Sequence, residues 1–109
     1  MKRSTWESII NASEKAMKAL LQARGFSKTR LIHYGAVDIH PNNLAIWVIV
    51  QTDEVKNRMI SDPDLLATCG EILAGQGYPG SSMEFIHIGV ESEETINRES
   101  AGNWYLHFK

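Results

Sequence analysis

The chain has 109 residues, of which 43% are hydrophobic and 22% charged, with a formal net charge of −2. That length suits a single domain over residues 1–109 and excludes two packed domains of ordinary size. The average composition excludes collagen-like, fibrous and fully disordered proteins. Because Cys69 is the one cysteine, a disulfide-built secreted scaffold is excluded as well.

Hydrophobic residues occur along the chain in short runs. The longest apolar run covers residues 44–50. It has the length of a strand and falls well short of the roughly 18 residues that cross a bilayer. The chain starts Met1-Lys2-Arg3 and continues with polar residues, without the apolar stretch of a secretory signal. We therefore expect a cytoplasmic protein with no membrane partner.

Charge is unevenly distributed along the chain. Residues 1–30 carry seven basic and two acidic residues, a net charge of +5. Residues 31–109 carry four basic and eleven acidic residues, a net charge of −7. Such polarity can steer a charged partner at physiological salt. The simpler interpretation is a basic helix that completes the surface of an acidic body.

The first predicted element is a helix over residues 5–24. Ser4 and Glu7 have the spacing of a capping box, in which each side chain accepts a hydrogen bond from a free backbone N–H. Gly25 suits the left-handed conformation that ends many helices. Apolar residues recur at helical spacing, at Trp6, Ile9, Ile10, Ala16, Met17, Leu20 and Leu21, with Ser13 as the small polar member of this face.

Two β-strands joined by a turn are predicted next. Residues 29–40 and 44–52 have strand character, and the Pro-Asn-Asn sequence at 41–43 is typical of a hairpin turn. One face of the second strand consists of Leu44, Ile46, Val48 and Val50, and the other of Ala45, Trp47, Ile49 and Gln51. Since both faces are mostly apolar, the pattern favours a central strand covered on both sides, or one that faces a partner.

A second helical region is predicted after the hairpin. Residues 53–60 can form one or two turns, and a helix then restarts with Asp62 as N-cap and Pro63 in its first position. The glycine-rich residues 75–80 end this helix. Its apolar face consists of Leu65, Leu66, Cys69, Ile72 and Leu73.

The last third of the chain predicts two strands and a polar link. Residues 83–90 and 104–108 have strand character, and residues 91–102 form a polar link that is compatible with a short helical turn. The order of elements is therefore α-β-β-α-β-β. Burial of both apolar helix faces then predicts an α+β fold, in which a four-stranded, mainly antiparallel sheet carries two helices on one face.

Patterns typical of enzymes and metal sites do not occur in the sequence. His87 and His107 would lie opposite each other if the last two strands pair, and His33 or a carboxylate would then be a third zinc ligand. Their spacing matches no metal-binding motif. Cys69 falls on the apolar face of its helix, where burial raises the pKa of a thiol and makes it inert. We therefore predict no catalytic residues, no metal and no cofactor.

Strand alternation predicts an aromatic face on the sheet. Trp104, Leu106 and Phe108 can point toward the helices together only if Tyr105 and His107 point away. The expected outer face therefore consists of Trp47, Phe85, His87, Tyr105 and His107, and it is edged by Glu91, Glu93 and Glu94. An open aromatic face costs solubility unless a partner, a second copy or a ligand covers it. Cover by a loop or arm of the same chain is the alternative.

This face leads to two hypotheses of function. The first is a non-enzymatic domain that binds another protein or a second copy of itself, because aromatic residues are enriched at the centres of interfaces. An inhibitor, antitoxin or immunity-type protein that masks a basic partner would work in this way. Nucleic acid is disfavoured, since the surroundings are acidic and no RNA-binding aromatic motif is present. The alternative is a small-molecule-binding domain or small enzyme whose pocket on the same face uses His87, Tyr105, His107 and Glu91.

Overall fold

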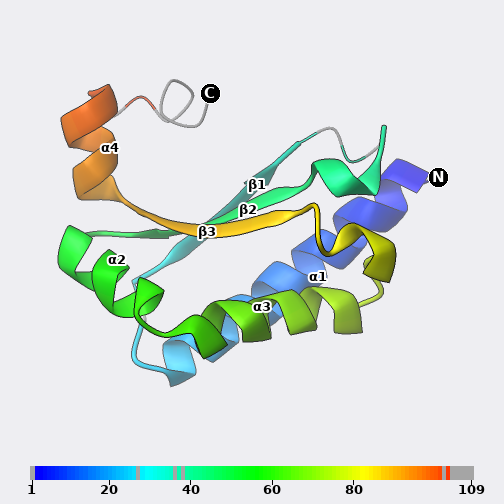
Figure 1. The fold of residues 1–109 in the computed structure, drawn as a ribbon, viewed down its shortest axis with the longest axis horizontal. Coiled ribbons are helices and arrows are strands. Elements are labelled where there is room, and N and C mark those ends of the chain that lie inside the picture. Colours follow the sequence, from blue (N-terminus) through cyan, green and yellow to red (C-terminus); the bar gives the residue numbers. More distant parts are fainter. Residues whose placement is uncertain (1, 27, 36, 38, 102, 104–109) are drawn as a thin grey trace.

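A computed structural model describes residues 2–26, 28–35, 37, 39–101 and 103 of the chain. The elements follow one another as α1 (Lys2–Ala23), β1 (Arg30–Tyr34), the 3-10 turn η1 (Pro41–Asn43), β2 (Ala45–Val50), α2 (Asp53–Ile60), α3 (Pro63–Gly75), the 3-10 turn η2 (Gly80–Ser82), β3 (His87–Ser92) and α4 (Glu93–Ser100) (Figure 1). The class is α+β, as predicted.

The three described strands form one sheet in the order β1-β2-β3. β1 and β2 pair antiparallel, as the predicted hairpin requires, with Ile32 opposite Trp47. β2 and β3 pair parallel, with Trp47 opposite Gly89. The expectation of a mainly antiparallel sheet is wrong for this second pair. Because α2 and α3 form the connection between these strands, the chain returns to the starting end of the sheet before β3 begins.

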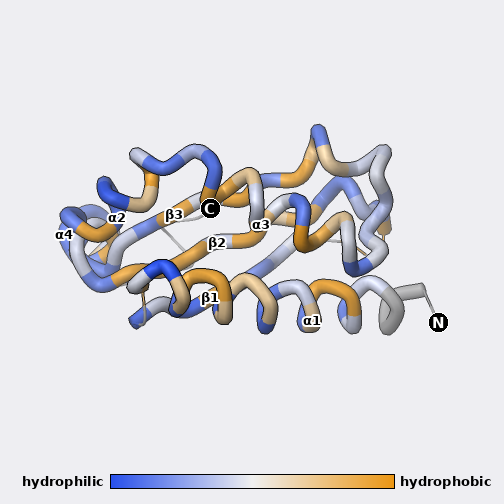
Figure 2. The backbone as a smooth tube through the Cα atoms, turned by 90° about the horizontal axis from the view of Figure 1, so that it is seen from below, coloured by the Kyte–Doolittle hydropathy of each residue, from blue (hydrophilic) through white to orange (hydrophobic). Residues whose placement is uncertain are grey.

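α1 and α3 lie side by side on one face of this sheet (Figure 1). The predicted division of β2 into two faces is confirmed. The side chains buried against the helices are Leu44, which directly precedes β2, and Ile46, Val48 and Val50 of the strand itself. Their partners include Ile10, Met17 and Leu21 of α1 and Leu65, Cys69 and Leu73 of α3. Hydrophobic positions recur at intervals along α1 (Figure 2), as expected of a helix with one buried face.

The start of α1 differs from the prediction. The helix begins at Lys2, so Ser4 lies inside it and the predicted capping box is wrong. Glu7 instead contacts His33 on β1, with 3.3 Å between its Oε2 and the imidazole Nε2. Ser13, the small polar residue on the apolar face, is fully buried and donates its hydroxyl to the Ile9 carbonyl over 2.7 Å.

The end of α1 is formed as the sequence predicts. Gly25 has a φ of +91°, which only glycine adopts without a steric cost. Its N–H donates to the Gln22 carbonyl over 3.1 Å, and the Phe26 N–H donates to the Leu21 carbonyl over 2.8 Å. These two bonds make a Schellman motif, which satisfies the last carbonyls of the helix.

The caps of α2 and α3 explain where these helices begin. The Thr52 hydroxyl accepts from the Val55 N–H over 3.3 Å at the start of α2. Asp62 Oδ1 accepts from the Leu65 N–H over 3.3 Å at the start of α3, and Pro63 occupies the first position of that helix. The predicted restart at Asp62 is therefore confirmed, because an N-cap acceptor and a proline both favour a new helix.

The last third of the described chain differs most from the prediction. The strand expected over residues 83–90 is shorter and later, at His87–Ser92. Part of the expected polar link, residues 91–102, is the helix α4, with the Ser92 hydroxyl accepting from the Thr95 N–H over 3.0 Å. The expected strand over residues 104–108 lies outside the described residues.

Within the described residues the fold thus has four α-helices and a three-stranded mixed sheet, in place of two helices and four strands. The helices exceed the predicted number because residues 53–60, expected to form one or two turns, are a separate helix α2, and because part of the polar link forms α4. None of the helices described combines the length and the apolar character needed to cross a membrane.

Candidate functional site

The sheet face opposite α1 and α3 carries one aromatic side chain from each strand. Tyr34 comes from β1, Trp47 from β2 and His87 from β3. The registers place Tyr34 and His87 opposite Ala45, which is two residues from Trp47 and therefore on the same face. We call these three side chains the aromatic platform.

Two contacts join the rings of the aromatic platform. The ring centroids of Trp47 and His87 are 4.7 Å apart, with a tilt of 51° between the ring planes. On the other side, the Trp47 indole Nε1 donates to the Tyr34 hydroxyl over 3.2 Å. Tyr34 is 42% exposed, His87 is exposed and Trp47 is half-buried. The platform thus presents ring surface to solvent while the indole N–H is satisfied.

Gly89 is the reason that the two rings can lie so close to the sheet. A Cβ atom at this position would lie 2.6 Å from His87 Nε2 and 2.7 Å from Trp47 Cζ3. Those distances are too short for any side chain, so one or both rings would have to move. The rings of Trp47 and His87 therefore pack directly on the backbone of Gly89, which we call the floor of the aromatic platform.

The sheet face that carries the aromatic platform is buried at the end nearest α4. Ile49 and Glu91 pair in register two residues beyond the Trp47–Gly89 pair, and they are only 2% and 8% exposed. Phe85 is 59% exposed and belongs to no strand, because its N–H donates to the Ser82 carbonyl over 2.9 Å in a turn after η2. The open part of the face is therefore the aromatic platform, with Phe85 near the start of β3.

The three glutamates expected at the edge of this face make contacts within the fold. Glu91 Oε1 accepts from Lys56 Nζ over 2.7 Å. Glu93 Oε1 lies 3.4 Å from Arg30 Nη2, and Glu94 Oε1 accepts from the Asp53 N–H over 2.7 Å. They belong to the end of β3 and the first turn of α4, where negative charge is favourable to the helix. All three glutamates therefore already have partners within the fold.

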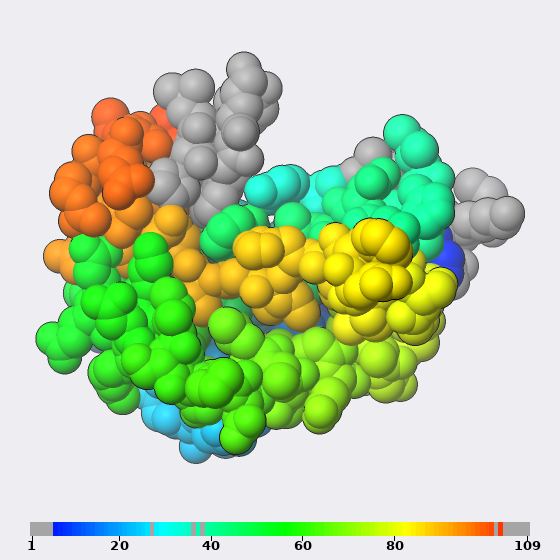
Figure 3. Space-filling model, viewed as in Figure 1, coloured from blue at the N-terminus to red at the C-terminus, as the bar shows by residue number. Residues whose placement is uncertain are grey.

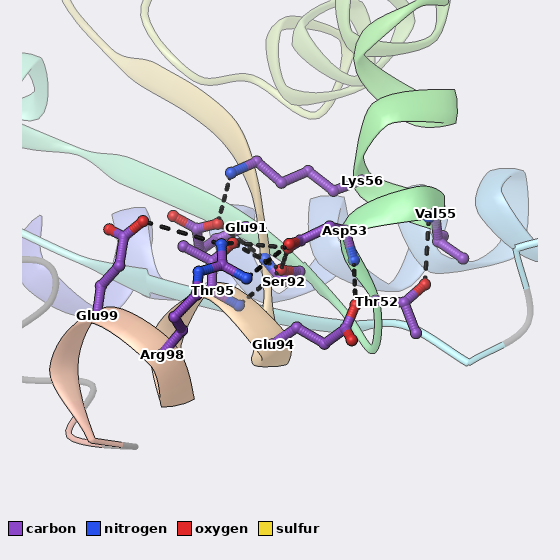
Figure 4. Close-up of polar contacts among 10 residues, drawn as sticks. All are labelled: Thr52, Asp53, Val55, Lys56, Glu91, Ser92, Glu94, Thr95, Arg98 and Glu99. Carbon is purple, nitrogen blue, oxygen red and sulfur yellow. Dashed lines mark hydrogen bonds and ion pairs between the residues drawn. The ribbon is translucent and has the colours of Figure 1, made fainter.

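A cluster of polar side chains ties α4 to α2, at the ends of the parallel strands β2 and β3 (Figure 4). We call it the polar lock, and its members are Asp53, Ser92, Thr95 and Arg98. Asp53 Oδ1 accepts from the Ser92 hydroxyl and, over 2.7 Å, from the Thr95 hydroxyl. Asp53 Oδ2 accepts from Arg98 Nη1 over 2.9 Å. One carboxylate therefore binds three donors of the β3–α4 segment.

These donors hold the pKa of Asp53 well below its ordinary value of 3.8, chiefly through the Ser92 hydroxyl, with Thr95 and Arg98 adding to the effect. In turn, the hydrogen bond to Asp53 raises the pKa of Arg98. Ser92 is fully buried and its hydroxyl binds a carboxylate that stays ionised. A nucleophilic serine needs access to substrate and a base that can take its proton, so the polar lock is structural.

His33 and His87 lie on opposite faces of the sheet. His33 Nδ1 is 2.9 Å from Glu14 Oε2 on α1, whereas His87 stacks on Trp47 on the other face. Because the sheet lies between the two imidazoles, they cannot bind the same metal ion. The part of the chain that the structure describes contains no group of three or more residues arranged as metal ligands. His107 and Tyr105, the remaining predicted site residues, lie outside that part.

Sequence reasoning missed Tyr34 and the polar lock. Tyr34 alternates with His33, so the choice between the two faces depends on the hairpin register, which the sequence leaves open. The polar lock had a signal in its two capping sequences, Thr52-Asp53 and Ser92-Glu93-Glu94-Thr95. Each predicts a helix start, but neither indicates that the two starts meet.

Comparison of the chain with protein-family models, curated proteins and solved structures finds no match. Any functional assignment therefore depends on the geometry of its own side chains.

Proposed function

We propose that this chain is a non-enzymatic protein-binding domain, and that a partner protein with a basic surface docks on the aromatic platform. The observation that carries the proposal is the set of three rings, one from each strand, on the sheet face opposite α1 and α3. Tyrosine and tryptophan are enriched at the centres of protein interfaces. Tyr34 and Trp47 supply such a centre, and His87 extends it.

The platform is ordered before any partner arrives, which favours binding. Trp47 is held by the Tyr34 hydroxyl, by His87 and by the floor at Gly89. Side chains that are already ordered lose less entropy when they enter an interface. This supports a docking role more than a scattered set of exposed aromatic residues would.

The charge of the chain supports a basic partner. Outside its first 30 residues the chain carries a net charge of −7. The glutamates near α4 contact Lys56, Arg30 and the Asp53 N–H, so we expect them to steer a partner over distance and not to bind it directly. Arginine and lysine side chains of the partner would lie on the faces of Trp47 and Tyr34. Inhibitors, antitoxins and immunity-type proteins mask basic partners in this manner.

A site-specific photo-crosslinker tests the proposal in the native host. The crosslinking residue replaces Phe85, which is 59% exposed and lies two residues before His87 in the chain. In a matched control it replaces Ile60, which is 50% exposed on α2. We expect position 85 to give an adduct with one basic protein, identified by mass spectrometry, and position 60 to give none. Tyr34→Ala should abolish the adduct while circular dichroism shows an intact fold.

Four other outcomes would overturn the proposal. An adduct of twice the mass of the chain would assign the face to a second copy. Equal adducts from positions 60 and 85 would mean nonspecific contact. If a small molecule instead copurifies with the wild type but not with Tyr34→Ala, while position 85 gives no adduct, that result would support a small-molecule site on the same face. The absence of an adduct at position 85 by itself would reject protein docking.

A further inference from the structure

A small hollow lies between the end of α1 and the start of α2, away from the aromatic platform. Its volume is about 190 Å³, and the side chains that matter in it are Phe26, Lys28, Thr29, Gln51, Val55 and Arg58. The end of α1 (light blue) lies against α2 (green) in Figure 3, so residues distant in the sequence meet here. We call it the Thr29 hollow.

The first unusual feature of the Thr29 hollow is a buried hydroxyl without a partner. Thr29 is only 5% exposed, and its Oγ1 has no hydrogen-bond partner among the described residues. A buried polar group that gives up its hydrogen bonds to water destabilises the fold unless another partner replaces them. Oγ1 itself is covered by protein atoms. Because Thr29 lines the hollow, a change of its χ1 rotamer would bring the hydroxyl to an acceptor atom bound there.

The second feature is a pair of positive charges without carboxylate partners. Within the described residues, no carboxylate oxygen lies within 4.0 Å of Lys28 or Arg58. The Arg58 guanidinium carbon lies 5.2 Å from the centroid of the Phe26 ring, which is the arrangement of a cation–π contact. This contact orients Arg58 at the hollow without neutralising its charge.

A neighbouring hollow contains further charged side chains that affect the potential at Arg58. A wider hollow on the other side of Phe26 and Arg58 is lined by Glu54 and by Arg24 and Asp62. Arg24 and Asp62 form an ion pair, with 3.5 Å between Nη1 and Oδ2. Glu54 is the remaining carboxylate there, and it lowers the positive potential at Arg58. Among the described residues, the lining of the Thr29 hollow has two cations and no acidic side chain.

We propose that the Thr29 hollow binds the phosphate group of a small phosphate monoester. Lys28, Arg58 and the Thr29 hydroxyl would donate to its oxygens, and the Gln51 amide offers a further donor. Phosphate fits this set better than a carboxylate, because a phosphate monoester carries a charge close to about −2 at pH 7 and the hollow presents two cations. The ring of Phe26 and the side chain of Val55 would pack against the organic group of the ester.

NMR titration of the whole chain tests the site with two probes, inorganic phosphate and phenyl phosphate. Ionic strength is kept constant with sodium chloride, because salt screens exposed charges. We expect saturable shifts of the amide signals of Lys28, Thr29, Gln51 and Arg58 with both probes. Phenyl phosphate should bind more tightly, because it adds the contact with Phe26 and Val55.

Charge variants test the donors against a matched control. Lys28→Gln and Arg58→Gln should each weaken phosphate binding about tenfold, the size expected for a hydrogen bond to a charged group. Lys15→Gln removes the same charge from the middle of α1 and should leave the affinity unchanged. Glu54→Gln should strengthen binding, because it removes a negative charge next to Arg58.

Thr29→Val distinguishes two roles of the Thr29 hydroxyl, which either binds the ligand or binds only water. The variant should weaken phosphate binding several-fold while raising the thermal midpoint of the free protein, because the unpartnered hydroxyl is removed. A lower thermal midpoint with unchanged phosphate affinity would assign the hydroxyl to bound water and overturn the site. Equal effects of Lys15→Gln and Lys28→Gln, or shifts that do not saturate, would overturn it too.

Discussion

Asp53 and Arg98 are 45 positions apart in the chain, and 2.9 Å separates Asp53 Oδ2 from Arg98 Nη1. This contact connects the first residue of α2 with the last turn of α4. Because the same carboxylate also binds Ser92 and Thr95, it is the centre of the polar lock. This one ionised side chain therefore provides three of the contacts that hold the β3–α4 segment against α2.

Asp53→Asn should loosen α4. The amide cannot accept from three donors as a carboxylate does, so the backbone N–H groups of residues 96–100 should exchange with deuterium faster than in the wild type. Since the fold lowers the pKa of Asp53 below 3.8, its stabilising effect is present above that pH and is lost as pH falls toward the lowered value. The difference in exchange should therefore shrink below about pH 4. Equal exchange at pH 7 would contradict the prediction.

Gly89→Ala should disturb the aromatic platform. The new methyl group meets His87 Nε2 at 2.6 Å and Trp47 Cζ3 at 2.7 Å, and overpacking of this kind typically costs about 1–3 kcal/mol. The indole N–H signal of Trp47, assigned with Trp47→Phe, should shift in the NMR spectrum. Gly75→Ala is the matched control, because a Cβ there meets no atom within 4 Å apart from its chain neighbours and the backbone of its own helix. A platform signal that stays in place in Gly89→Ala would show that the rings do not rest on this backbone.

His33 should make stability depend on pH. The hydrogen bond to Glu14 is the largest cause that raises the pKa of His33 above its ordinary 6.5, and Glu7 adds to it, while partial burial opposes both. A raised pKa stabilises the folded state fully below pH 6.5, and this contribution is lost as pH rises through the folded value. Urea denaturation should therefore show lower stability at pH 8.5 than at pH 5.5. Both His33→Gln and Glu14→Gln should reduce that difference, and an unchanged difference would be inconsistent with this role.

Leu21 should matter more to stability than its neighbour Leu20. The first helix is expected to pack through Ile9, Ile10, Met17 and Leu20, and of this set Ile10 and Met17 are fully buried. Leu21 is also 0% exposed, whereas Leu20 is only partly buried. Leu21→Ala should cost about 2–5 kcal/mol in chemical denaturation, and Leu20→Ala less. A loss below about 0.5 kcal/mol for Leu21→Ala, as at a surface position, would mean that α1 is peripheral.

Cys69 should react slowly with thiol reagents in the folded protein. Its side chain is fully buried, and that burial raises the pKa of the thiol. Only the thiolate is nucleophilic, so both its access and its ionised fraction are low. The rate with a disulfide reagent at pH 8 should be far lower than in denaturant, where the same thiol reacts freely. Fast reaction under native conditions would place Cys69 at an accessible site.

Local chemistry in the sequence determined the helices around the sheet. The apolar spacing of residues 5–24 predicted the face of α1, and Gly25 predicted its end, because both depend on positions within a few residues of each other. Asp62 and Pro63 located the start of α3 for the same reason. The start of α1 was missed, since Ser4 and Glu7 fit a cap but the helix continues back to Lys2.

Contacts between distant parts of the chain decided the sheet and the candidate sites. β3 is parallel to β2, and this direction follows from how α2 and α3 return the chain. The sequence alone indicated Trp47 and His87 as members of one face, but Tyr34 and the floor at Gly89 depend on the register of three strands. Asp53 is 42 positions from Thr95. No local pattern encodes such a meeting, because only packing of the whole chain brings the two helix starts together.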